Sequence, residues 1–242
     1  MREIRIYQPG EYESGQIVDL SPEASQHVGV VLRMQPGEEL CLFCGDNREF
    51  AARITQVKKK SVTVEILQVK EQNRESPLAI HLAQAISKGD RMEWVMQKAV
   101  ELGVSSITPV ISARCVVKLD QERMAKKLQQ WQAIAIAACE QSGRNVVPKV
   151  HSALAFAEYI GSTTTPFKFI LHPENSQNWR SIELKQEPVS LLIGPEGGFN
   201  EEEVALAKAS GFQALSLGPR ILRTETAAIS ALSLLQALMG DL

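Results

Sequence analysis

Two glycine-rich segments near the C-terminus carry the residues of this chain whose types and spacing could do chemistry. LLIGPEGGFNEEEV spans Leu191–Val204, and LGPRILRTETAA spans Leu217–Ala228. Glycine lets backbone N–H and C=O groups approach a ligand closely and adopts positive φ without strain. The same segments hold groups that could accept a proton or steady a developing charge; they are Glu196, Arg220, Arg223 and Glu225. The two segments predict a small-molecule pocket with charged groups in its wall.

The sequence around these segments predicts the strands and helices that would hold them. Val189–Ile193 and Ala214–Leu217 are short apolar runs bounded by glycine and proline, as buried strands are. A helix start follows each loop: Asn200 stands three residues before Glu203, and Thr224 precedes acidic and alanine-rich sequence. Two strand–loop–helix units put both loops at the carboxyl ends of neighbouring strands, where open α/β sheets bind ligands.

The spacing of the glycines narrows the class of ligand. Gly194, Gly197 and Gly198 do not match the G-x-G-x-x-G dinucleotide fingerprint, which disfavours a nicotinamide dehydrogenase. No lysine or serine follows Gly198, as a nucleoside-triphosphate loop would require. A pocket made mostly of backbone, with few cations in its first loop, suits an adenosine-like ligand without a polyphosphate.

The pattern of predicted strands and helices changes along the chain, which predicts two domains, residues 1–72 and 73–242. The first alternates in short strand-like pieces between turn signals, which predicts a small antiparallel barrel or sandwich. Its strands are expected at Glu39–Phe43, Phe50–Gln56 and Ser61–Val69. The polar stretch KEQNRESP at 70–77 is the linker candidate. Beyond it strands and helices alternate, which predicts an α/β fold with a mostly parallel sheet.

Further elements of the second domain follow from periodicity. They are expected at Leu78–Ile86, Ser106–Ile111 and Phe167–Leu171 as strands, and at 90–102, Gln121–Gln141 and Thr226–Met239 as helices. Asp90 and Glu93 have the spacing of a capping box, and Gly103 closes that helix. The last helix is apolar on more than one face, which predicts burial in a core or against a partner.

Composition excludes some classes of function. The chain has 242 residues and a formal net charge of −2, so nucleic-acid binding would need a local basic face. No apolar run approaches the ~18 residues of a membrane span. The start, MREIRIYQPGEY, lacks a signal-peptide core, which predicts a cytoplasmic location. Cys41 and Cys44 have no second C-x-x-C to complete a zinc site, so no metal is expected.

Five segments, taken in order, resemble one known family. GPEGGF and LGPRILRTETA resemble the S-adenosylmethionine-binding loops of the SPOUT methyltransferases. His27–Leu40, Ser87–Val110 and Glu140–Val150 extend the likeness to the bacterial RsmE family, which methylates N3 of a uridine in 16S ribosomal RNA. The resemblance implies a PUA-like RNA-binding barrel at 1–72 and a trefoil-knotted SPOUT domain at 73–242. It also implies a homodimer formed through the last helix and the small ribosomal subunit as substrate.

The resemblance also implies which residues bind S-adenosylmethionine. Three loops should converge on it, with backbone groups of Leu217, Ile221 and Leu222 on the adenine. Ile221 and Leu222 could instead be ordinary core, and His172 could be a structural hydrogen-bonding residue. The expected cofactor-binding residues are Leu171, His172, Gly194, Pro195, Glu196, Gly197, Gly198, Leu217, Gly218, Arg220, Ile221, Leu222, Arg223, Thr226 and Ala227.

Methyl transfer to N3 requires that the N3 proton leave or that the uridine anion be stabilised. The catalytic candidates are Glu196, Arg223 and Glu225. Glu196 could be the base or could cap its loop, and Arg223 could hold the uracil oxygens or pair with Glu225. The RNA-binding candidates, each with a plain surface role as the alternative, are Arg2, Arg5, Arg33, Lys88, Arg91, Arg114, Gln141 and Arg144.

Two other functions stay open at this point. One is a SPOUT methyltransferase acting at another RNA position, such as a ribose 2′-oxygen. The other is a non-catalytic RNA-binding assembly factor that retains the pocket. The IL-RTETA form of the last loop and the accompanying N-terminal barrel favour the base methyltransferase.

Overall fold

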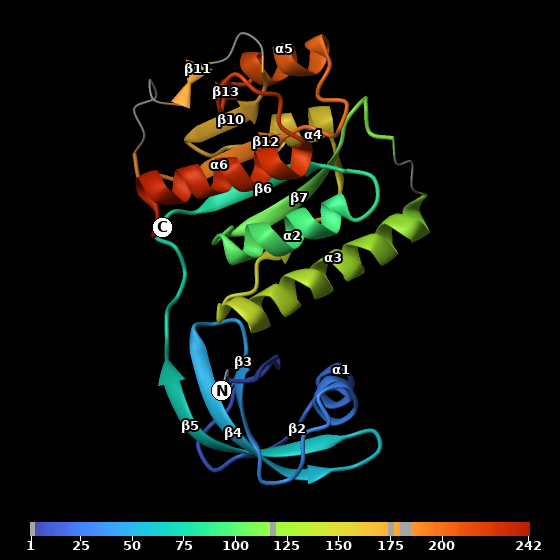
Figure 1. Cartoon of the computed structure of the whole chain (residues 1–242), viewed down its shortest axis with the longest axis vertical. Coiled ribbons are helices and arrows are strands. Elements are labelled where there is room, and N and C mark those ends of the chain that lie inside the picture. The colour runs from blue at the N-terminus through green and yellow to red at the C-terminus, as the bar shows by residue number, and fades with distance from the viewer. Residues whose placement is uncertain (1–2, 117–119, 174–176, 180–184) are drawn as a thin grey trace. The chain divides into compact units, whose positions relative to one another are not determined.

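The computed structural model describes residues 3–116, 120–173, 177–179 and 185–242 (Figure 1). The chain divides into two compact units. The first contains Met1–Glu75 and Cys139–Val147, and the second contains Ser76–Ala138 and Pro148–Leu242. The chain therefore passes from one unit to the other after Glu75, after Ala138 and after Val147.

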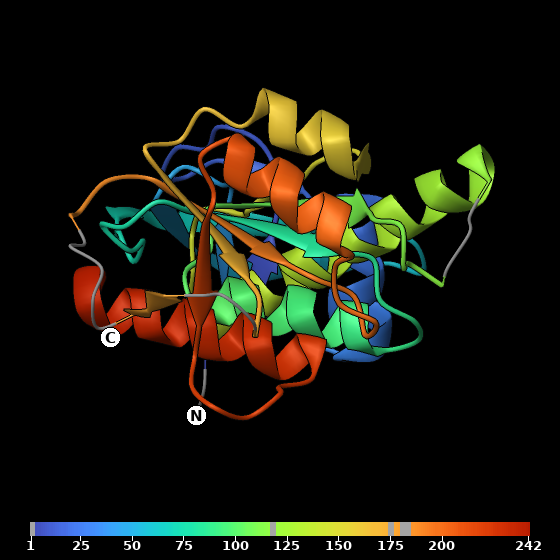
Figure 2. The ribbon, with the colours of Figure 1, turned by 90° about the horizontal axis from the view of Figure 1, so that it is seen from above.

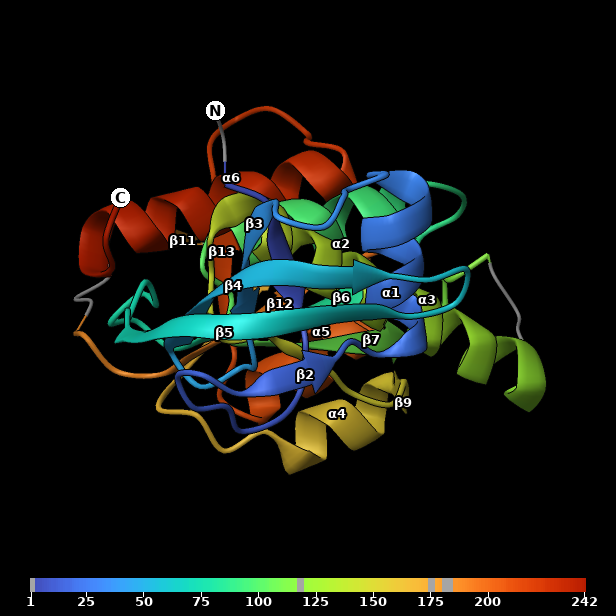
Figure 3. The same cartoon turned by 90° about the horizontal axis from the view of Figure 1, so that it is seen from below.

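The first unit is built on a five-stranded sheet with the order β1-β3-β4-β5-β2. Figure 3 shows β4, β5 and β2 side by side. β1 pairs with β3 in parallel, and the other neighbours are antiparallel. The strands are β1 (Arg5–Tyr7), β2 (Ile17–Asp19), β3 (Glu39–Phe43), β4 (Arg48–Val57) and β5 (Val62–Glu71). The small, mainly antiparallel sheet is confirmed, and β5 continues into the stretch predicted as linker.

Two short helical segments, which the pattern did not predict, connect β2 to β3. They are α1 (Pro22–Gln26) and the π-helical turn η1 (His27–Val31). Ser21 caps α1 through its side chain, which accepts a hydrogen bond from the Ala24 N–H. Both segments are about five residues long, too short for a helical period to appear in the sequence.

A cluster of buried ionic and polar side chains lies in the first unit, and we call it the arginine cluster. Arg5 donates to Glu49 Oε1 at 2.8 Å and to Asn145 Oδ1 at 2.5 Å. Arg74 also pairs with Glu49, and Arg144 pairs with Glu75. The side chains of Arg5 and Arg144 are only 7% and 6% exposed. Their prediction as RNA-binding residues is corrected, since both guanidinium groups are used to hold residues 139–147 in this unit.

The second unit is built on an eight-stranded sheet with the order β11-β13-β10-β12-β6-β7-β8, and β9 pairs with β7. Every pairing in it is parallel, which confirms the predicted fold class. The strands are β6 (Ile80–Ala85), β7 (Ser106–Ile111), β8 (Lys149–Val150), β9 (Leu154–Ala155), β10 (Phe167–Leu171), β11 (Gln177–Asn178), β12 (Val189–Ile193) and β13 (Gln213–Ser216). The trefoil knot stays a prediction of the resemblance.

Helices cover both faces of this sheet, with α4 and α5 on one face and α2 and α6 on the other (Figure 2). All five residues of β12 are buried, because strands covered on both faces need no polar side. The helices are α2 (Arg91–Glu101), α3 (Gln121–Ser142), α4 (Phe156–Ser162), α5 (Glu201–Ala209) and α6 (Thr224–Met239).

The predicted helix starts have different outcomes. Asn200 Oδ1 accepts from the Glu203 N–H at 2.7 Å and Glu203 Oε2 accepts from the Asn200 N–H at 3.0 Å, so the capping box of α5 is confirmed. The box predicted for α2 is wrong: Asp90 has helical φ and ψ and makes no side-chain cap within the described residues. Glu93 instead accepts from the Gln130 side chain at 2.8 Å.

Gln236 joins the end of α6 to the end of α2. Its amide donates to the Leu102 carbonyl at 2.9 Å, and its Oε1 accepts from Ser76 Oγ at 2.6 Å. The bond satisfies a carbonyl that the end of α2 leaves without an intrahelical partner. Gly103 is needed beside it, because a Cβ there would lie 2.7 Å from Gln236 Nε2.

The cysteines of the described residues are free thiols. Burial raises the pKa of Cys41 and of Cys44 to about 11, so neither is a ready nucleophile. In the part of the chain that the structure describes, no three His, Cys, Asp or Glu side chains gather as metal ligands would. No described helix is long and apolar enough to cross a membrane.

Candidate active site

The loops that follow β10, β12 and β13 surround a cavity of about 950 Å³ in the second unit. It lies at the carboxyl ends of these parallel strands, the position predicted from the two glycine-rich segments. Of the predicted cofactor-binding residues, the lining includes Leu171, His172, Gly194, Pro195, Glu196, Gly197, Gly198, Leu217, Gly218, Arg220, Ile221, Leu222, Arg223 and Ala227. Thr226, the remaining one, is exposed on α6 outside the lining.

Glycine is required at one point of this lining. Gly218 has φ +128°, a conformation that other residues adopt only with strain. Beside Gly197, the Arg114 side chain lies along the first loop, because Arg114 Nη1 donates to the Gly197 carbonyl at 2.9 Å.

A buried hydroxyl fixes the two glycine-rich loops to each other. Thr224 Oγ1 donates to the Gly194 carbonyl at 2.5 Å and accepts from Gln84 Nε2 at 3.0 Å. Gln84 is fully buried in β6. The helix start predicted at Thr224 is confirmed, since α6 begins there; the N-cap is Arg223, and the threonine hydroxyl bonds across to the other loop.

Glu196 is held by two donors. Its Oε1 accepts from the Lys88 backbone N–H at 2.9 Å and from Arg91 Nη1 at 2.8 Å. Partial burial raises the pKa of Glu196, but hydrogen bonds from backbone N–H groups and from Arg91 outweigh it, so the pKa lies below its ordinary value. A carboxylate so stabilised is a poor proton acceptor, which favours the loop-holding role over the base.

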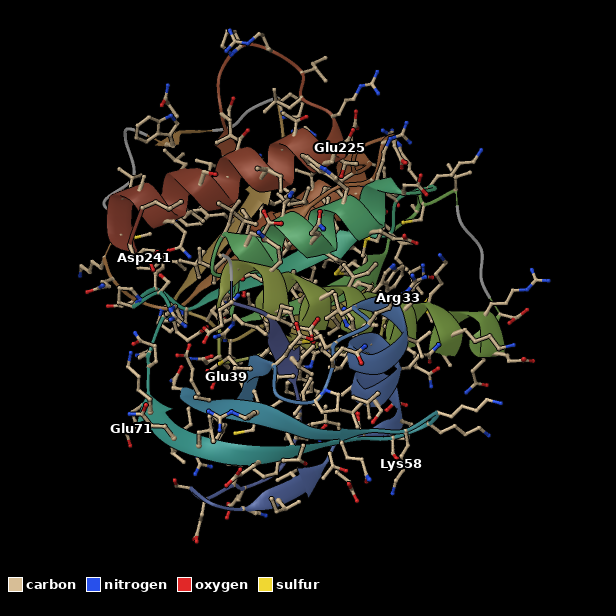
Figure 4. All side chains as sticks on the ribbon, turned by 60° about the horizontal axis from the view of Figure 1, so that its bottom comes forward. Arg33, Glu39, Lys58, Glu71, Glu225 and Asp241 are labelled. Atoms are coloured by element: carbon tan, nitrogen blue, oxygen red, sulfur yellow. The ribbon has the colours of Figure 1, made fainter. Side chains whose placement is uncertain are left out.

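Glu225, at the start of α6, is placed differently (Figure 4). Its Oε1 lies 3.9 Å from Arg91 Nε, so Arg91 is shared with Glu196. Its Oε2 is buried and has no hydrogen-bond partner within the described ranges. The described ion pair of Glu225 is thus with Arg91, whereas Arg223 is exposed at the cavity wall.

The structure also bears on whether Ile221 is a core residue and whether His172 is a structural hydrogen-bonding residue. Ile221 is 89% exposed, which rules out ordinary core at this position. The backbone N–H of His172 donates to the Leu215 carbonyl at 3.2 Å, which joins the end of β10 to β13. Its half-buried side chain lines the cavity.

The RNA-binding candidates are divided between the two units. Arg91 and Arg114 line the cavity, and the Lys88 backbone contacts Glu196 beside it. Gln141 is exposed near the end of α3, and Arg33 is exposed with φ +54° after η1. Arg2 lies outside the described residues.

The sequence reasoning missed one wall of the cavity, which one face of α5 supplies. The residues are Glu201, Val204, Ala205 and Lys208. Their spacing of three, four and seven residues is that of one helical face. The confirmed helix start at Asn200 would have been enough to predict that this face follows the loop.

Comparison with known families decides what kind of protein carries this cavity. A family model described as an RNA methyltransferase domain matches residues 74–236, and one described as an RNA methyltransferase PUA domain matches residues 20–67. The ribosomal RNA small subunit methyltransferase E (RsmE) of Bacillus subtilis is 33% identical over 96% of this chain and 95% of its own. The chain belongs to the RsmE family.

Solved structures agree with that membership. An RsmE from Neisseria gonorrhoeae bound to S-adenosyl methionine is 42% identical, with a TM-score of 0.93 over 99% of both chains. A putative methyltransferase from Legionella pneumophila in complex with the bound cofactor SAM is 60% identical, with a TM-score of 0.98 over 100% of both chains. The resemblance on which the sequence analysis relied is thereby confirmed.

Proposed function

We propose that this RsmE-family protein transfers the methyl group of S-adenosylmethionine to N3 of a uridine in the 16S RNA of the small ribosomal subunit. The cavity formed by the two glycine-rich loops carries this proposal, because relatives with the same overall fold are bound to that cofactor. Because its proposed substrate is the ribosomal subunit, the protein is proposed to act in the cytoplasm.

The residues present fit S-adenosylmethionine. Leu217, Ile221 and Leu222 line the cavity, and their backbone groups are proposed to bind the adenine without a charged clamp. The first glycine-rich loop has no lysine or serine after Gly198, so it does not form a polyphosphate loop. When bound, the cofactor supplies an electrophilic methyl group on a sulfonium sulfur.

The side chains around the cavity supply the rest of the chemistry. Arg220 and Arg223 are exposed at its wall, where their guanidinium groups can bind the uracil oxygens and stabilise negative charge as N3 loses its proton. Glu196 and Arg91 keep the first loop in position for the acceptor base.

The first unit is proposed to bind the RNA through the region after η1. Arg33 lies at the end of η1 and Lys58 at the β4–β5 turn, both labelled in Figure 4. Val30 and Val31, which precede Arg33, are 58% and 66% exposed. Exposed apolar groups beside cations suit single-stranded RNA, whose bases and phosphates both need contacts.

Binding of isolated small subunits by fluorescence anisotropy tests this surface. We expect Arg33→Ala to weaken binding and to reduce its salt dependence. Arg53→Ala is the control, since Arg53 is also exposed in the first unit but is paired with Glu39. Equal affinities for the two variants would remove Arg33 from the RNA-binding surface.

The protein is further proposed to be a homodimer formed through α6. Ala228, Ala231 and Leu235 face the unit's own core, whereas Leu238 on the same helix is 45% exposed. Light scattering should therefore detect a dimer that Leu238→Asp dissociates. Leu206→Asp is the matched control, because Leu206 is 41% exposed on α5, across the sheet.

Methyl transfer from labelled S-adenosylmethionine to small subunits lacking the modification tests the function itself. Nucleoside mass spectrometry should detect 3-methyluridine in 16S RNA and none in transfer RNA. Label on a ribose would keep the methyltransferase and move the target atom. Cofactor binding without transfer to any RNA would support the assembly factor.

A further inference from the structure

Gln84 is a residue of β6 that the sequence analysis did not single out. It is fully buried and pairs in the sheet with Ile193, the last residue of β12. Its Nε2 donates to Thr224 Oγ1 at 3.0 Å and to the Ala85 carbonyl at 3.1 Å. Gln84 is not part of the cavity lining, whereas Thr224 and Gly194 both are. Any effect of Gln84 on the cavity therefore passes through a neighbour.

The hydrogen bonds around the Thr224 hydroxyl run in one direction. A carbonyl can only accept, so the hydroxyl proton points at the Gly194 carbonyl, whose oxygen is 2.5 Å from Oγ1. Since a hydroxyl has a single proton, Gln84 must supply the proton of the other bond. A chain of hydrogen bonds thus runs from the Gln84 amide through the Thr224 hydroxyl to the Gly194 carbonyl.

The orientation of the Gln84 amide follows from its neighbours. Both groups next to Nε2, the Thr224 oxygen and the Ala85 carbonyl, accept hydrogen bonds. A reversed amide would place Oε1 against these two acceptors and lose both bonds. The observed orientation leaves Oε1 buried without a hydrogen-bond partner among the described residues, which is unfavourable and rare. Two donated bonds are kept and one acceptor is left unpaired.

We propose that Gln84 is a positioning residue for S-adenosylmethionine, because its amide commits the Thr224 hydroxyl to the Gly194 carbonyl. This inference rests on the proposed function, in which the cofactor lies between the two glycine-rich loops. A hydroxyl that accepts a hydrogen bond is a stronger donor, because hydrogen bonds in a chain polarise one another. The chain connects an interior strand of the sheet to Gly194 in the first loop and to Thr224 after the second. The separation of the loops therefore depends on a residue outside the cavity lining.

A second buried glutamine provides a matched control. Gln236 is also fully buried, and its amide donates to the Leu102 carbonyl and accepts from Ser76. Gln236 and these two partners are not part of the cavity lining. Methionine is similar in length to glutamine but has no amide, so replacing either glutamine by methionine should lower the melting temperature. Only the replacement of Gln84 should change the affinity for the cofactor.

Calorimetric titration with S-adenosylmethionine is the first test. Gln84→Met should raise the Kd about five- to tenfold, the effect of one hydrogen bond, whereas Gln236→Met should leave it within about twofold. An unchanged Kd in Gln84→Met, with a melting temperature lowered as in Gln236→Met, would overturn the proposal. Gln84 would then contribute to stability alone.

A double variant tests whether Gln84 acts through Thr224. Thr224→Val removes the hydroxyl and should itself raise the Kd about tenfold, while Thr224→Ser keeps the hydroxyl and should stay within about threefold. Adding Gln84→Met to Thr224→Val should change the Kd by less than about twofold, because the bond that Gln84 supports is already absent. Multiplied losses, or equal losses in Thr224→Ser and Thr224→Val, would overturn the proposal.

One measurement needs no variant at position 84 and serves if Gln84→Met does not fold. The protein is isotope-labelled at the glutamine side-chain nitrogens, and its amide signals are followed by NMR. The Gln84 signals should shift in Thr224→Val, because one amide proton loses its acceptor, and the Gln236 signals should stay in place. Unmoved Gln84 signals would mean that the bond to Thr224 is not formed in solution, which would overturn the proposal.

The proposed function and the role of Gln84 fail in different ways. In active protein, Gln84→Met should raise the KM for S-adenosylmethionine and leave kcat within about threefold, because the loss concerns cofactor binding. A lower kcat with an unchanged KM and Kd would contradict the positioning role. If the wild-type protein binds the cofactor but forms no 3-methyluridine, the proposed function fails, and the Kd comparison still decides the role of Gln84.

Discussion

Thr224 shows how one hydroxyl can organise a cavity. It donates to the Gly194 carbonyl and accepts from Gln84, so β6, the first glycine-rich loop and the start of α6 meet at a single buried oxygen. Threonine is short enough to join the two glycine-rich loops where their backbones come close together. Larger side chains would separate the loops whose backbone forms the cavity.

Replacing Thr224 by valine should lower the free energy of unfolding by about 1–3 kcal/mol, because the buried Gly194 carbonyl loses the Thr224 hydroxyl and the Gln84 amide keeps only its bond to the Ala85 carbonyl. Urea denaturation measures the change. Thr55→Val is the matched control, since Thr55 donates to the Thr63 carbonyl in an exposed place. Its effect should stay within about 0.5 kcal/mol, and equal losses would contradict the role given to Thr224.

Gly218→Ala should weaken S-adenosylmethionine binding about tenfold, because an alanine at φ +128° forces the second loop to shift. Calorimetry measures the Kd. Gly37→Ala imposes a similar strain at φ +94° in the first unit, at a residue that is not part of the cavity lining. That variant should be less stable while its cofactor Kd is unchanged, so an equal loss of affinity in both would refute a local effect.

At the scale of the element, the capping of α5 determines where this helix begins and which of its residues line the cavity. Its capping box fixes Asn200 and Glu203, and Glu203 also accepts from the Ala113 N–H at 2.7 Å. The face that follows supplies Val204 and Lys208 to the cavity. The cap therefore sets the start of the helix and, through it, the position of a cavity wall.

Asn200→Ala should destabilise the protein by about 1 kcal/mol, the usual cost of losing an N-cap. Glu203→Ala should cost more, because it removes the other half of the box and leaves the Ala113 N–H unpaired. Thermal unfolding of the two variants measures the order. Equal losses would mean that the Ala113 contact contributes nothing.

Regular elements were predictable where local pattern alone decides them. The bounds of β3, β7, β10 and β12 follow from apolar runs between turn residues. The convergence of the two glycine-rich loops also followed, because parallel strands end at one edge of the sheet. The start of α2 at Asp90 was also predicted, but its capping box was not formed, because Asp90 is helical in backbone and Glu93 bonds to α3 instead.

Contacts between residues far apart in the chain were not predictable. Arg5 and Arg144 have the composition of surface cations, but their carboxylate partners lie 44 and 69 residues away. Only the folded chain identifies Glu49 and Glu75 as those partners. For the same reason the sequence could name Glu196 and Glu225 together, but only the folded chain shows that Glu196 accepts two hydrogen bonds whereas Glu225 Oε2 has no hydrogen-bond partner among the described residues.

At the scale of the whole molecule, the second unit carries an acid-sensitive histidine outside the cavity lining. His81 in β6 lies 2.7 Å from Ser106 Oγ through Nδ1, and its ring lies 5.8 Å from that of His151. Burial, with a smaller contribution from His151, lowers the pKa of His81 to about 4. The imidazole is therefore neutral in the folded protein at pH values where an unfolded chain would protonate it.

Stability should fall as the pH decreases from about 6.5 to about 4, because only the unfolded state gains a proton at His81 in that window. The loss is at most about 3 kcal/mol. His81→Asn should flatten this part of the profile in urea denaturation at a series of pH values. His27→Asn, at a half-buried position in the first unit, is the control, and an unchanged slope in His81→Asn would assign the acid sensitivity elsewhere.

The first unit is built from two separate stretches of the chain, which limits how its domains can be exchanged with those of related enzymes. Residues 139–147 belong to that unit, and Asn145 and Arg144 in them bond to Arg5 and Glu75. A gene fusion that grafts residues 1–75 onto another methyltransferase leaves those partners behind and buries unpaired charges. Exchange of RNA specificity between relatives therefore requires two simultaneous transplants, and a single-crossover chimera should be an unstable protein rather than a retargeted enzyme.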